Sequence, residues 1–407
     1  MNKKSALALA ISAAFAAPAL AQTTASTVQI YGKLYPQFTS FKSSGATAPG
    51  GVTTNLVPQP SAAEAINHDR RWAVDTQNSY IGLRGEEKLG GSLGVIWQIE
   101  QALDFDAGNS ALWANRNSFV GLRGGFGTVK LGNMDTIYKE YGDQFSMFGL
   151  NSGNYTSASN TLSHIGIGNV RQARFHERAP NSVQYETPEF SDFTLGIQYS
   201  PDEAKGNPGE RRDQKLWSYG IKYDSERWYA SVHQEHHYDF FGGSRNATAV
   251  ANPTGATTGA SSKDTGTRLS LAFKLTRDHT FTFDIAQLLY EESGQTAAGR
   301  FEEYKRINWA IGWEARWGGP LRTGIQFVKM NEGDCSLSGG VACSTSGLDG
   351  RQISLGTAYD LSKRTFIFAL FSRLTNGESA LFDNWANGTP GRGGDTTQFG
   401  AGVQHRF

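Results

Sequence analysis

The sequence predicts an all-β fold, a transmembrane antiparallel β-barrel of about 16 strands, and three observations support this prediction. Short segments along the whole chain alternate apolar and polar residues, as strands with one apolar face do. Their connections alternate between tight turns and long polar loops, a pattern typical of outer-membrane barrels. The polar face carries charges of both signs, which cannot be buried dry unless they are paired. The charged face is therefore expected to line water, and the apolar face to contact lipid.

The chain begins with a segment typical of a secretory signal. Two lysines are followed by an apolar run over residues 6–17, which is shorter than the roughly 18 apolar residues that a membrane-spanning helix needs. Ala19 and Ala21 then supply the small-residue cleavage site of a Sec-type signal. We expect residues 1–21 to be removed on export from a bacterial cytoplasm, and residues 22–407 to form the barrel.

The composition excludes a nucleic-acid-binding function and permits a membrane location. Lysine and arginine together number 38, as do aspartate and glutamate, and the bases are scattered rather than gathered on one face. A barrel strand turns only every second residue toward lipid, so the low mean hydropathy of the chain is compatible with a barrel. An outer-membrane hydrolase is the enzymatic alternative, but no catalytic motif supports it. We expect neither enzymatic activity nor a cofactor.

The N-terminal strands are an isolated segment followed by two hairpins. Gly90 and Gly91 supply the turn of the first hairpin, residues 124–127 supply the turn of the second, and residues 43–69 are predicted as a long loop. The apolar residues on one face of these segments are Val28, Ile30, Leu34, Ile81, Leu83, Leu93, Val95, Trp97, Ile99, Val120, Leu122, Val129 and Leu131.

The same hairpin unit recurs from residue 183 onward, and a single strand closes the series. A barrel of about 16 strands is wide enough to leave an aqueous channel, whereas side chains would fill a barrel of about eight. The pattern does not assign the orientation of the segment 365–373. The predicted hairpins cover residues 183–199, 217–232, 269–285, 307–327 and 353–373, and the last strand covers residues 396–407.

One connection is far longer than the others and is rich in aromatic residues. Between Gly132 and Pro180, roughly 45 residues pass without strand periodicity, and a loop of that length is usually either functional or disordered. Tyr138 and Phe148 are among several aromatic residues that make this segment unlike a disordered linker. We expect residues 133–177 to be the third external loop, folded into the barrel as a constriction.

Two groups of metal-ligating residue types have simpler explanations. Cys335 and Cys343 are the only cysteines and lie in a loop rich in glycine and serine, where a local disulfide is expected in an oxidising compartment. His233, Glu235 and His237 alternate on one strand face, but side chains at this spacing lie about 7 Å apart and no further ligand is indicated. We therefore predict a disulfide and no metal site.

Several motifs give the chain a family resemblance that covers essentially the whole sequence after the signal. They are Val28–Gly32, Tyr80–Gly90, Asn115–Leu122, Gly125–Gly132, Asn181–Tyr185, Ser362–Thr365 and Val403–Phe407. Together they resemble the Gram-negative general porins of the β-proteobacterial type. The resemblance implies an outer-membrane pore, usually a homotrimer, through which small hydrophilic solutes diffuse passively. It also implies that Phe407 is read by the outer-membrane assembly machinery.

The chain departs from the family pattern at positions that face the pore. Family members usually have an arginine where Tyr80 stands, often a base where Gln184 stands, and an acidic residue near Tyr35. In the family, arginines of the wall face acidic residues of the third loop. The corresponding residues here are Lys33, Arg84, Arg123, Lys130 and Arg178 for the wall, and Asp135, Glu140 and Asp143 for the loop. Because the wall has more bases than acids, we expect a weak preference for anions.

Two other functions stay open at this point. A substrate-specific channel for a sugar, an amino acid or phosphate is suggested by the aromatic loop and by the missing arginine at Tyr80. The other possibility is a structural or adhesive barrel whose long loops bind a partner. A closed barrel would give no conductance in a planar bilayer, whereas a specific channel would conduct a current that its solute blocks.

Overall fold

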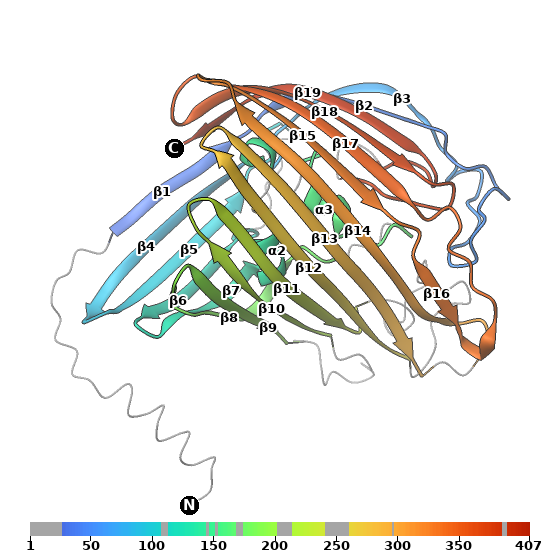
Figure 1. The fold of residues 1–407 in the computed structure, drawn as a ribbon, viewed down its shortest axis with the longest axis horizontal. Helices are drawn as coiled ribbons and strands as arrows, with labels where there is room; N and C mark the ends of the chain where they lie inside the picture. The colour runs from blue at the N-terminus through green and yellow to red at the C-terminus, as the bar shows by residue number, and fades with distance from the viewer. Residues whose placement is uncertain are drawn as a thin grey trace, which may run out of the picture.

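The described part of the protein is a closed antiparallel sheet with short helices inside it (Figure 1). Among the described residues, no helix is long and apolar enough to cross a bilayer. The predicted signal at residues 1–21 lies outside the described residues. The computed structural model describes residues 27–106, 113–143, 146–150, 154–167, 174–201, 214–240, 260–294, 297–384 and 389–407.

The sheet contains nineteen β-segments, each paired with its neighbours around the barrel in an antiparallel sense. Their bounds are β1 Thr27–Leu34, β2 Gln37–Ser44, β3 His68–Asp75, β4 Tyr80–Gly90, β5 Leu93–Ala102, β6 Ser118–Gly124, β7 Gly127–Asp135, β8 Arg178–Glu186, β9 Phe193–Ser200, β10 Lys215–Asp224, β11 Trp228–Tyr238, β12 Ser261–Thr276, β13 His279–Ser293, β14 Phe301–Arg316, β15 Leu321–Met330, β16 Asp334–Leu337, β17 Gly350–Asp360, β18 Thr365–Asn376 and β19 Asp395–Arg406.

Three pairs of consecutive segments are single strands interrupted by a bend. β1 and β2 both pair with β19, and on their other edge they pair with β4 and β3, which form the next interrupted strand. β15 and β16 both pair with β14. The first interruption falls at Pro36, which has no N–H to donate to a neighbouring strand. With each pair counted once, the closed barrel has 16 strands, and the predicted fold class is confirmed.

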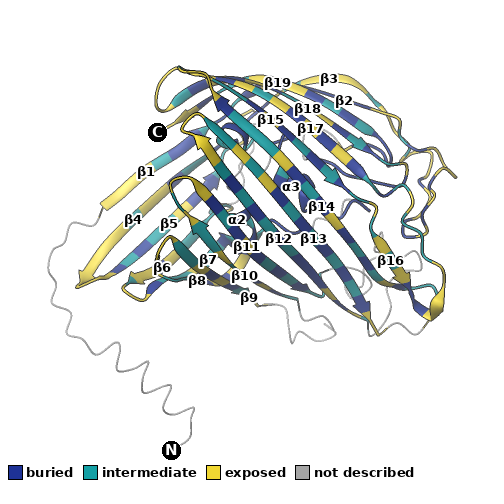
Figure 2. Ribbon diagram, viewed as in Figure 1, coloured by how far each residue is buried: buried dark blue, intermediate teal, exposed yellow. Residues whose placement is uncertain are grey.

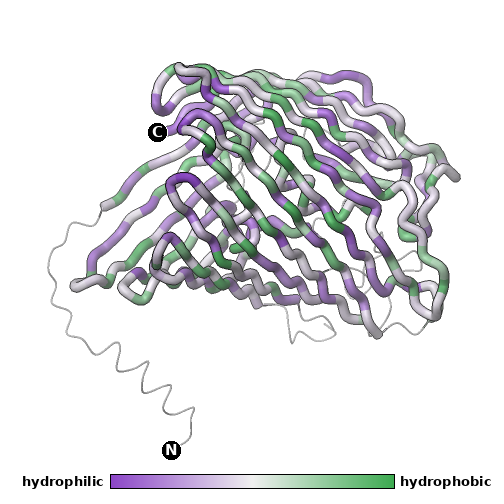
Figure 3. Tube along the Cα trace, viewed as in Figure 1, coloured by the Kyte–Doolittle hydropathy of each residue, from purple (hydrophilic) through white to green (hydrophobic). Residues whose placement is uncertain are grey.

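The two faces of the strands differ as the alternation predicted. In β11, Val232 is 51% exposed on the outer surface, whereas the next residue, His233, is 1% exposed on the inner face. Trp217, Trp228 and Trp317 also lie on the exposed face. Figure 2 shows the alternation of burial along the long strands, and Figure 3 shows hydrophobic and hydrophilic positions alternating along the same traces. The outer surface therefore suits contact with lipid.

The connections confirm one end of short turns and one end of long loops, which we call the short-turn end and the loop end. Gly90 and Gly91 form the β4–β5 turn with φ values of 116° and 56°, which glycine adopts without steric cost. At the other end, residues 45–67 and 331–349 and the described parts of 377–394 form the first, seventh and eighth loops, and the described parts of residues 136–177 form the third. Short turns of such barrels lie on the periplasmic side.

Besides β2, which continues the first predicted strand beyond Pro36, two strand segments were not predicted. β3 continues the strand that β4 completes, but its residues Asp69, Arg70 and Arg71 put charges on both alternations and obscure the pattern. β16 has only four residues and lies within the predicted seventh loop. Both segments are short extensions held by their neighbours: β3 pairs with β2, and β16 pairs with β14.

The third loop lies inside the barrel, as predicted, and contains helices that were not predicted. α2 (Ile137–Gly142) contacts β9 to β12, η1 (Met147–Gly149) contacts β15, and α3 (Ala158–Leu162) contacts β14 and β15. Thr136 caps α2, because its side chain accepts a hydrogen bond from the N–H of Lys139 at 3.2 Å. Helices of five or six residues are too short to show a periodic pattern in the sequence.

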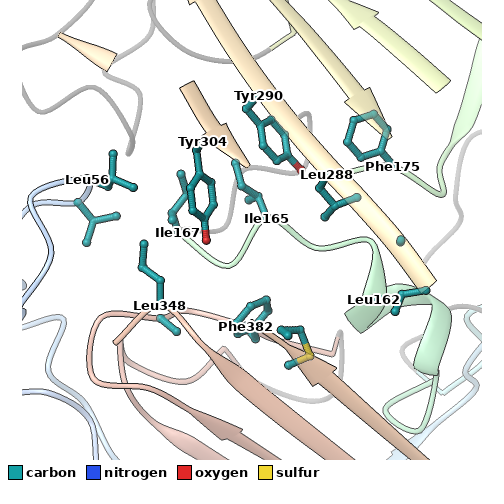
Figure 4. Close-up of a cluster of buried hydrophobic side chains, with 14 of the residues drawn as sticks. Leu56, Leu162, Ile165, Ile167, Phe175, Leu288, Tyr290, Tyr304, Leu348 and Phe382 are labelled. Atoms are coloured by element: carbon teal, nitrogen blue, oxygen red, sulfur yellow. The ribbon is translucent and has the colours of Figure 1, made fainter. Parts of the chain in front are cut away.

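A large apolar core fills part of the barrel interior. This differs from the prediction, because the charges on the inner face of the strands had indicated an interior filled with water. The core joins β13 to β15 and β18 to the first, third, seventh and eighth loops, and Figure 4 shows its centre. A second core places the η1 region against Tyr35 and the inner face of β18. The main core contains Val52, Leu56, Val57, Tyr138, Leu162, Ile165, Ile167, Phe175, Ala286, Leu288, Tyr290, Phe301, Tyr304, Ala310, Val328, Met330, Leu337, Leu348, Leu374, Ala380 and Phe382.

Candidate functional site

A polar cavity of about 590 Å³ lies between the third loop and the wall on the opposite side of the barrel interior; we call it the constriction cavity. The strands β1, β4, β5, β7, β8 and β19 contribute to it, together with the segment that precedes β6. Its lining consists of Lys33, Asn78, Tyr80, Glu100, Asn115, Arg116, Asn117, Asn133, Asp135, Lys139, Asp143, Gly149, Asn160, Arg174, His176, Glu177, Arg178 and Arg406.

The wall side of the constriction cavity carries three bases. Arg116 donates from Nε to Glu100 Oε1 at 2.5 Å, and its guanidinium lies 4.8 Å from the centre of the Tyr80 ring. The Lys33 ammonium lies 5.5 Å from the centre of the same ring. Neither Lys33 nor Arg406 has a carboxylate within ion-pair distance among the described residues. These two side chains leave positive charge uncompensated on the wall.

On the loop side, the acidic residue closest to the strand end is neutralised by two bases. Asp135 Oδ1 lies 2.9 Å from Arg178 Nη2 and 3.1 Å from Lys139 Nζ. Asn117 donates from Nδ2 to Asp135 Oδ2 at 2.9 Å. The antiparallel pairing of β7 with β8 places Asp135 directly opposite Arg178, so the sheet itself builds this ion pair. Asp135 therefore contributes little free negative charge to the cavity.

A second loop carboxylate is held by a buried histidine. His176 Nε2 lies 3.4 Å from Asp143 Oδ1. Burial lowers the pKa of His176 below its ordinary value, even though Asp143 beside it acts in the opposite direction. The imidazole is therefore neutral at pH 7, and the pair keeps one negative charge at the edge of the cavity.

The constriction cavity has an excess of positive charge. Its lining includes six basic side chains, Lys33, Arg116, Lys139, Arg174, Arg178 and Arg406, and four acidic ones, Glu100, Asp135, Asp143 and Glu177. Each of these acids has a basic or histidine partner within 4.0 Å. The surplus comes from Lys33 and Arg406, which lie on paired residues of adjacent strands.

Four of the eight predicted pore residues line this cavity, and two lie behind the third loop. Lys33, Asp135, Asp143 and Arg178 line it. Glu140 does not, because Gln184 donates to its Oε2 at 3.4 Å on the far side of α2. Lys130 lies in the same neighbourhood, with Nζ donating to Gln184 Oε1 at 3.0 Å and lying 3.3 Å from Glu186 Oε2.

The other two predicted wall residues lie away from the cavity. Arg84 is exposed, donates from Nε to Gln29 Oε1 at 2.9 Å and covers the Tyr31 ring at 4.6 Å. Arg123 is one residue from the β6–β7 turn and is exposed at the short-turn end. These two residues lie outside the constriction cavity, because the alternation along a strand gives the face on which a residue lies and not its height along the barrel.

Sequence reasoning missed several basic residues of the cavity. Arg116 precedes β6 and has no strand phase, and Arg406 is one residue from the end of the chain. Arg174 belongs to the third loop. The one signal in the sequence was Tyr80, which stands where the related sequences usually have an arginine. The Arg116 guanidinium lies over the Tyr80 ring, so the segment before β6 supplies a positive charge beside the position where the arginine is missing.

The remaining predicted features lie outside the cavity. Cys335 and Cys343 are joined by a disulfide, with Cα atoms 5.8 Å apart, in the seventh loop. His237 Nε2 lies 2.9 Å from Glu235 Oε1, and both side chains are buried on the inner face of β11. Within the described residues, no group of three or more histidine, cysteine or acidic side chains is arranged to hold a metal ion.

A closed barrel of 16 strands with its third loop folded inward and a charged cavity beside that loop defines an outer-membrane β-barrel protein of the porin type. The chain belongs to the Gram-negative porin family, whose model matches residues 6–379. This membership locates the protein in the outer membrane.

Individual relatives match part of their length. The major outer membrane protein P.IB of Neisseria lactamica is 36% identical over 161 residues, which cover 39% of this chain and 43% of the relative. The protein of the same name from Neisseria meningitidis serogroup B is 29% identical over 194 residues, which cover 47% of this chain and 53% of the relative. The chain thus spans about half, or less, of the curated relatives that it matches.

Solved structures match over nearly the full chain and show the fold. The anion-selective porin from Comamonas acidovorans has a TM-score of 0.69 and 21% identity, with 94% of this chain and 100% of that chain covered. Outer-membrane expressed OmpT of Vibrio cholerae has a TM-score of 0.61 and 14% identity, with 95% and 99% covered.

Proposed function

We propose that the barrel is an outer-membrane pore through which small hydrophilic solutes diffuse passively, with a preference for anions. The observation that carries this proposal is the pair Lys33 and Arg406, whose charges face the constriction cavity without a carboxylate partner among the described residues. The four acids of the cavity are each engaged by a neighbouring base or histidine. An anion in the cavity therefore meets uncompensated positive charge, whereas a cation meets Asp143 as the one lining carboxylate without a charged partner among the described residues.

The third loop supplies the narrowing in this proposal. In the described parts of residues 136–177, α2, η1 and α3 lie against the wall from β9 to β15, and Asp143 and Arg174 line the cavity. Solutes would pass on the other side of the loop, along β1, β4, β5 and β7. No step in this passage requires a cofactor or covalent chemistry.

The preference should be weak and dependent on salt. The cavity is open to water, and the Debye length is about 10 Å at 0.1 M salt and about 3 Å at 1 M, so ions in solution screen the wall charges. The structurally similar porin from Comamonas acidovorans is anion-selective, which is consistent with this proposal. The effect of Lys33 and Arg406 should therefore be largest in dilute electrolyte.

Reversal potentials across a planar bilayer test the proposal. With potassium chloride at two concentrations, the wild-type protein should give a potential of the sign that chloride permeation produces. The double variant Lys33→Gln, Arg406→Gln should move it toward zero or reverse it. Arg277→Gln is the matched control, because Arg277 is an exposed base on the β12–β13 turn outside the constriction cavity. Cation preference in the wild-type protein, or an unchanged potential in the double variant, would overturn the proposed selectivity.

The assembled form is proposed to be a homotrimer in the outer membrane, with Phe407 as an assembly signal. The N–H and the C=O of Phe407 exchange hydrogen bonds of 3.2 Å with the backbone of Gly32, where the first and last strands meet. Chemical cross-linking of protein extracted in mild detergent would detect a trimer, and a Phe407→Ser variant should yield less of it in the outer membrane.

A substrate-specific channel is the second candidate, and Tyr80 favours it. The Tyr80 ring lines the constriction cavity with a guanidinium and an ammonium beside it, so an aromatic surface adjoins two cations. Such a channel would carry a current that its solute blocks at low concentration. A general pore would show no such block by sugars, amino acids or phosphate.

A further inference from the structure

A second basic cavity, separate from the constriction cavity, lies at the short-turn end of the barrel, and we call it the exit cavity. It has a volume of about 560 Å³. The β14–β15 turn, the β17–β18 turn and the end of β19 line it, and Phe148 of the third loop also contributes. Arg406 lines both cavities, so the two adjoin along β19.

Positive charge dominates the lining of the exit cavity. Among the described residues, Asp360 is the one acid in its lining, and two arginines pair with it: Arg316 Nη1 lies 2.8 Å from Oδ2 and Arg322 Nη2 lies 2.7 Å from Oδ1. Lys363 and Arg364, on the β17–β18 turn, have no carboxylate within ion-pair distance among the described residues, as is also the case for Arg406. Three bases therefore face this cavity without a compensating charge.

Two buried polar groups in the same lining lack hydrogen-bond partners. The Gln404 side chain is fully buried, and neither its amide nitrogen nor its amide oxygen has a partner. The Nε of Arg322 is also buried and unpartnered. A buried amide or guanidinium N–H without a partner destabilises the protein, because it has lost its hydrogen bonds to water. Such groups call for a ligand that accepts hydrogen bonds.

The Arg322 guanidinium lies near two aromatic rings of the lining to which Gln404 also belongs. Its centre lies 4.6 Å from the Phe366 ring and 5.2 Å from the Phe148 ring. Phe366 pairs in register with Gln404 on β19 and with Asp360 on β17, and β17 pairs with β15, so Arg322, Asp360, Phe366 and Gln404 lie on successive strands of the wall. Because Asp360 takes Nη2, the Nε–H of Arg322 is left to serve another acceptor. A pre-positioned donor of this kind favours planar or tetrahedral oxyanions.

We infer that the exit cavity is a binding site for a small oxyanion, a carboxylate or a phosphate, held by Gln404, Arg322, Arg364 and Arg406. The inference rests on the proposed function, because the exit cavity would be a second binding site for an anion that has passed the constriction cavity. The amide N–H of Gln404 and the Nε–H of Arg322 donate to the oxyanion, and Arg364 and Arg406 supply charge. Chloride satisfies these donors less well, because it lacks the separate oxygen atoms that two converging donors address.

The test uses the full chain in detergent micelles and inorganic phosphate as the probe. Isothermal titration calorimetry in a chloride buffer should detect phosphate binding to the wild-type protein. Gln404→Leu and Arg364→Gln should each weaken binding about tenfold, because the first removes a hydrogen-bond donor to a charged ligand and the second removes a positive charge beside it. Arg277→Gln is the matched control, because it removes the same charge from an exposed turn outside both cavities and should bind as the wild type does.

The outcomes separate this inference from the proposed function. A wild-type protein that conducts chloride but binds no phosphate would overturn the inference and leave the pore intact. Binding that Lys33→Gln weakens and that Gln404→Leu and Arg364→Gln leave unchanged would place the anion in the constriction cavity and also overturn it. Absence of conductance would instead reject the proposed function. Because Arg364 is an exposed turn residue, its variant keeps the test decisive even if Gln404→Leu fails to fold.

Discussion

The interior of the barrel has two unlike halves. The wall from β11 to β18, the packed half, is covered by the third loop and by apolar cores, and includes strands of 15 and 16 residues. The wall from β4 to β8, the open half, has strands of 7 to 11 residues and borders the constriction cavity. The constriction cavity therefore lies along one side of the barrel, and aromatic residues of the third loop pack in the apolar cores on the other side.

Inward-facing bases differ between the halves in the same way. In the packed half, Arg268 is fully buried and donates from Nη2 to Gly142 O at 2.8 Å and to Asp284 Oδ1 at 2.9 Å. Arg306 donates from Nη1 to Ile165 O at 2.9 Å. In the open half, Arg84 remains exposed. Inward-facing arginines that look alike in the sequence therefore bind the third loop in the packed half and remain exposed in the open half.

The largest expected effect comes from breaking a loop anchor in the packed half. Arg268→Met removes the guanidinium that joins α2 to the wall and leaves Asp284 buried without its ion-pair partner. We expect the free energy of unfolding in detergent to fall by about 3–5 kcal/mol and the single-channel conductance to rise as the loop detaches. Arg84→Met, in the open half, is the control and should change stability by about 0.5 kcal/mol or less. Equal losses in both variants would contradict the division into halves.

A smaller loss is expected from the disulfide of the seventh loop. Cys335 and Cys343 enclose a short loop beside the packed half, and both pack against its main core. The double variant Cys335→Ser, Cys343→Ser should lower the free energy of unfolding by about 2 kcal/mol without changing ion selectivity. A reducing agent should reproduce the loss in the wild-type protein and have no effect on the variant. A change in reversal potential would show that this loop reaches the passage.

Acid should weaken the attachment of the third loop. Burial lowers the pKa of His164 and of His176 below the ordinary value, so both are neutral in the folded loop at pH 7. The unfolded chain takes up protons as the pH falls through the ordinary histidine pKa of about 6.5, and the folded loop does not, so stability falls from pH 7 toward pH 5. Urea unfolding across that range should give a flatter profile for His164→Gln, His176→Gln. Parallel profiles would exclude these histidines as the cause.

The smallest effect is expected from bases outside the constriction cavity. Arg84→Gln and Arg123→Gln change exposed residues that do not line it, so the reversal potential should stay at the wild-type value. Lys33→Gln, which removes a buried base of that cavity, should shift it. A shift from Arg123→Gln equal to that from Lys33→Gln would extend the selective region to the short-turn end.

Much of the barrel could be predicted because lipid on one side and water on the other impose alternation on each strand. The prediction failed where that contrast is lost. β18 has Phe366, Phe368 and Leu370 on its inner face and Ile367 and Phe371 on the other, so its two faces look equally apolar in the sequence. Its inner face packs against the third loop instead of water.

For the residues of the candidate site, the sequence predicted which side chains face the barrel interior, but not how far along the barrel each one lies. Lys33 and Arg178 were identified because strand phase puts them inside, and the sheet register then pairs Arg178 with Asp135. Arg116 and Arg174 lie on irregular segments, whose placement depends on tertiary contacts. Arg123 has the alternation of an inward-facing residue, but it lies beside the β6–β7 turn and not at the level of the constriction cavity.

Because the constriction cavity lies on one side of the barrel, mutations in the loops that cover the packed half should affect it less than mutations beside the open half. The first, seventh and eighth loops are bonded to one another above the main core, for example by Asn55 Nδ2 to Ala342 O at 2.7 Å and by Thr47 Oγ1 to Glu378 O at 2.7 Å. These three loops cover the packed half at the loop end of the barrel. In the proposed pore, substitutions on the outer side of these loops should leave the constriction cavity unchanged, because the contacts that join the loops lie away from its lining.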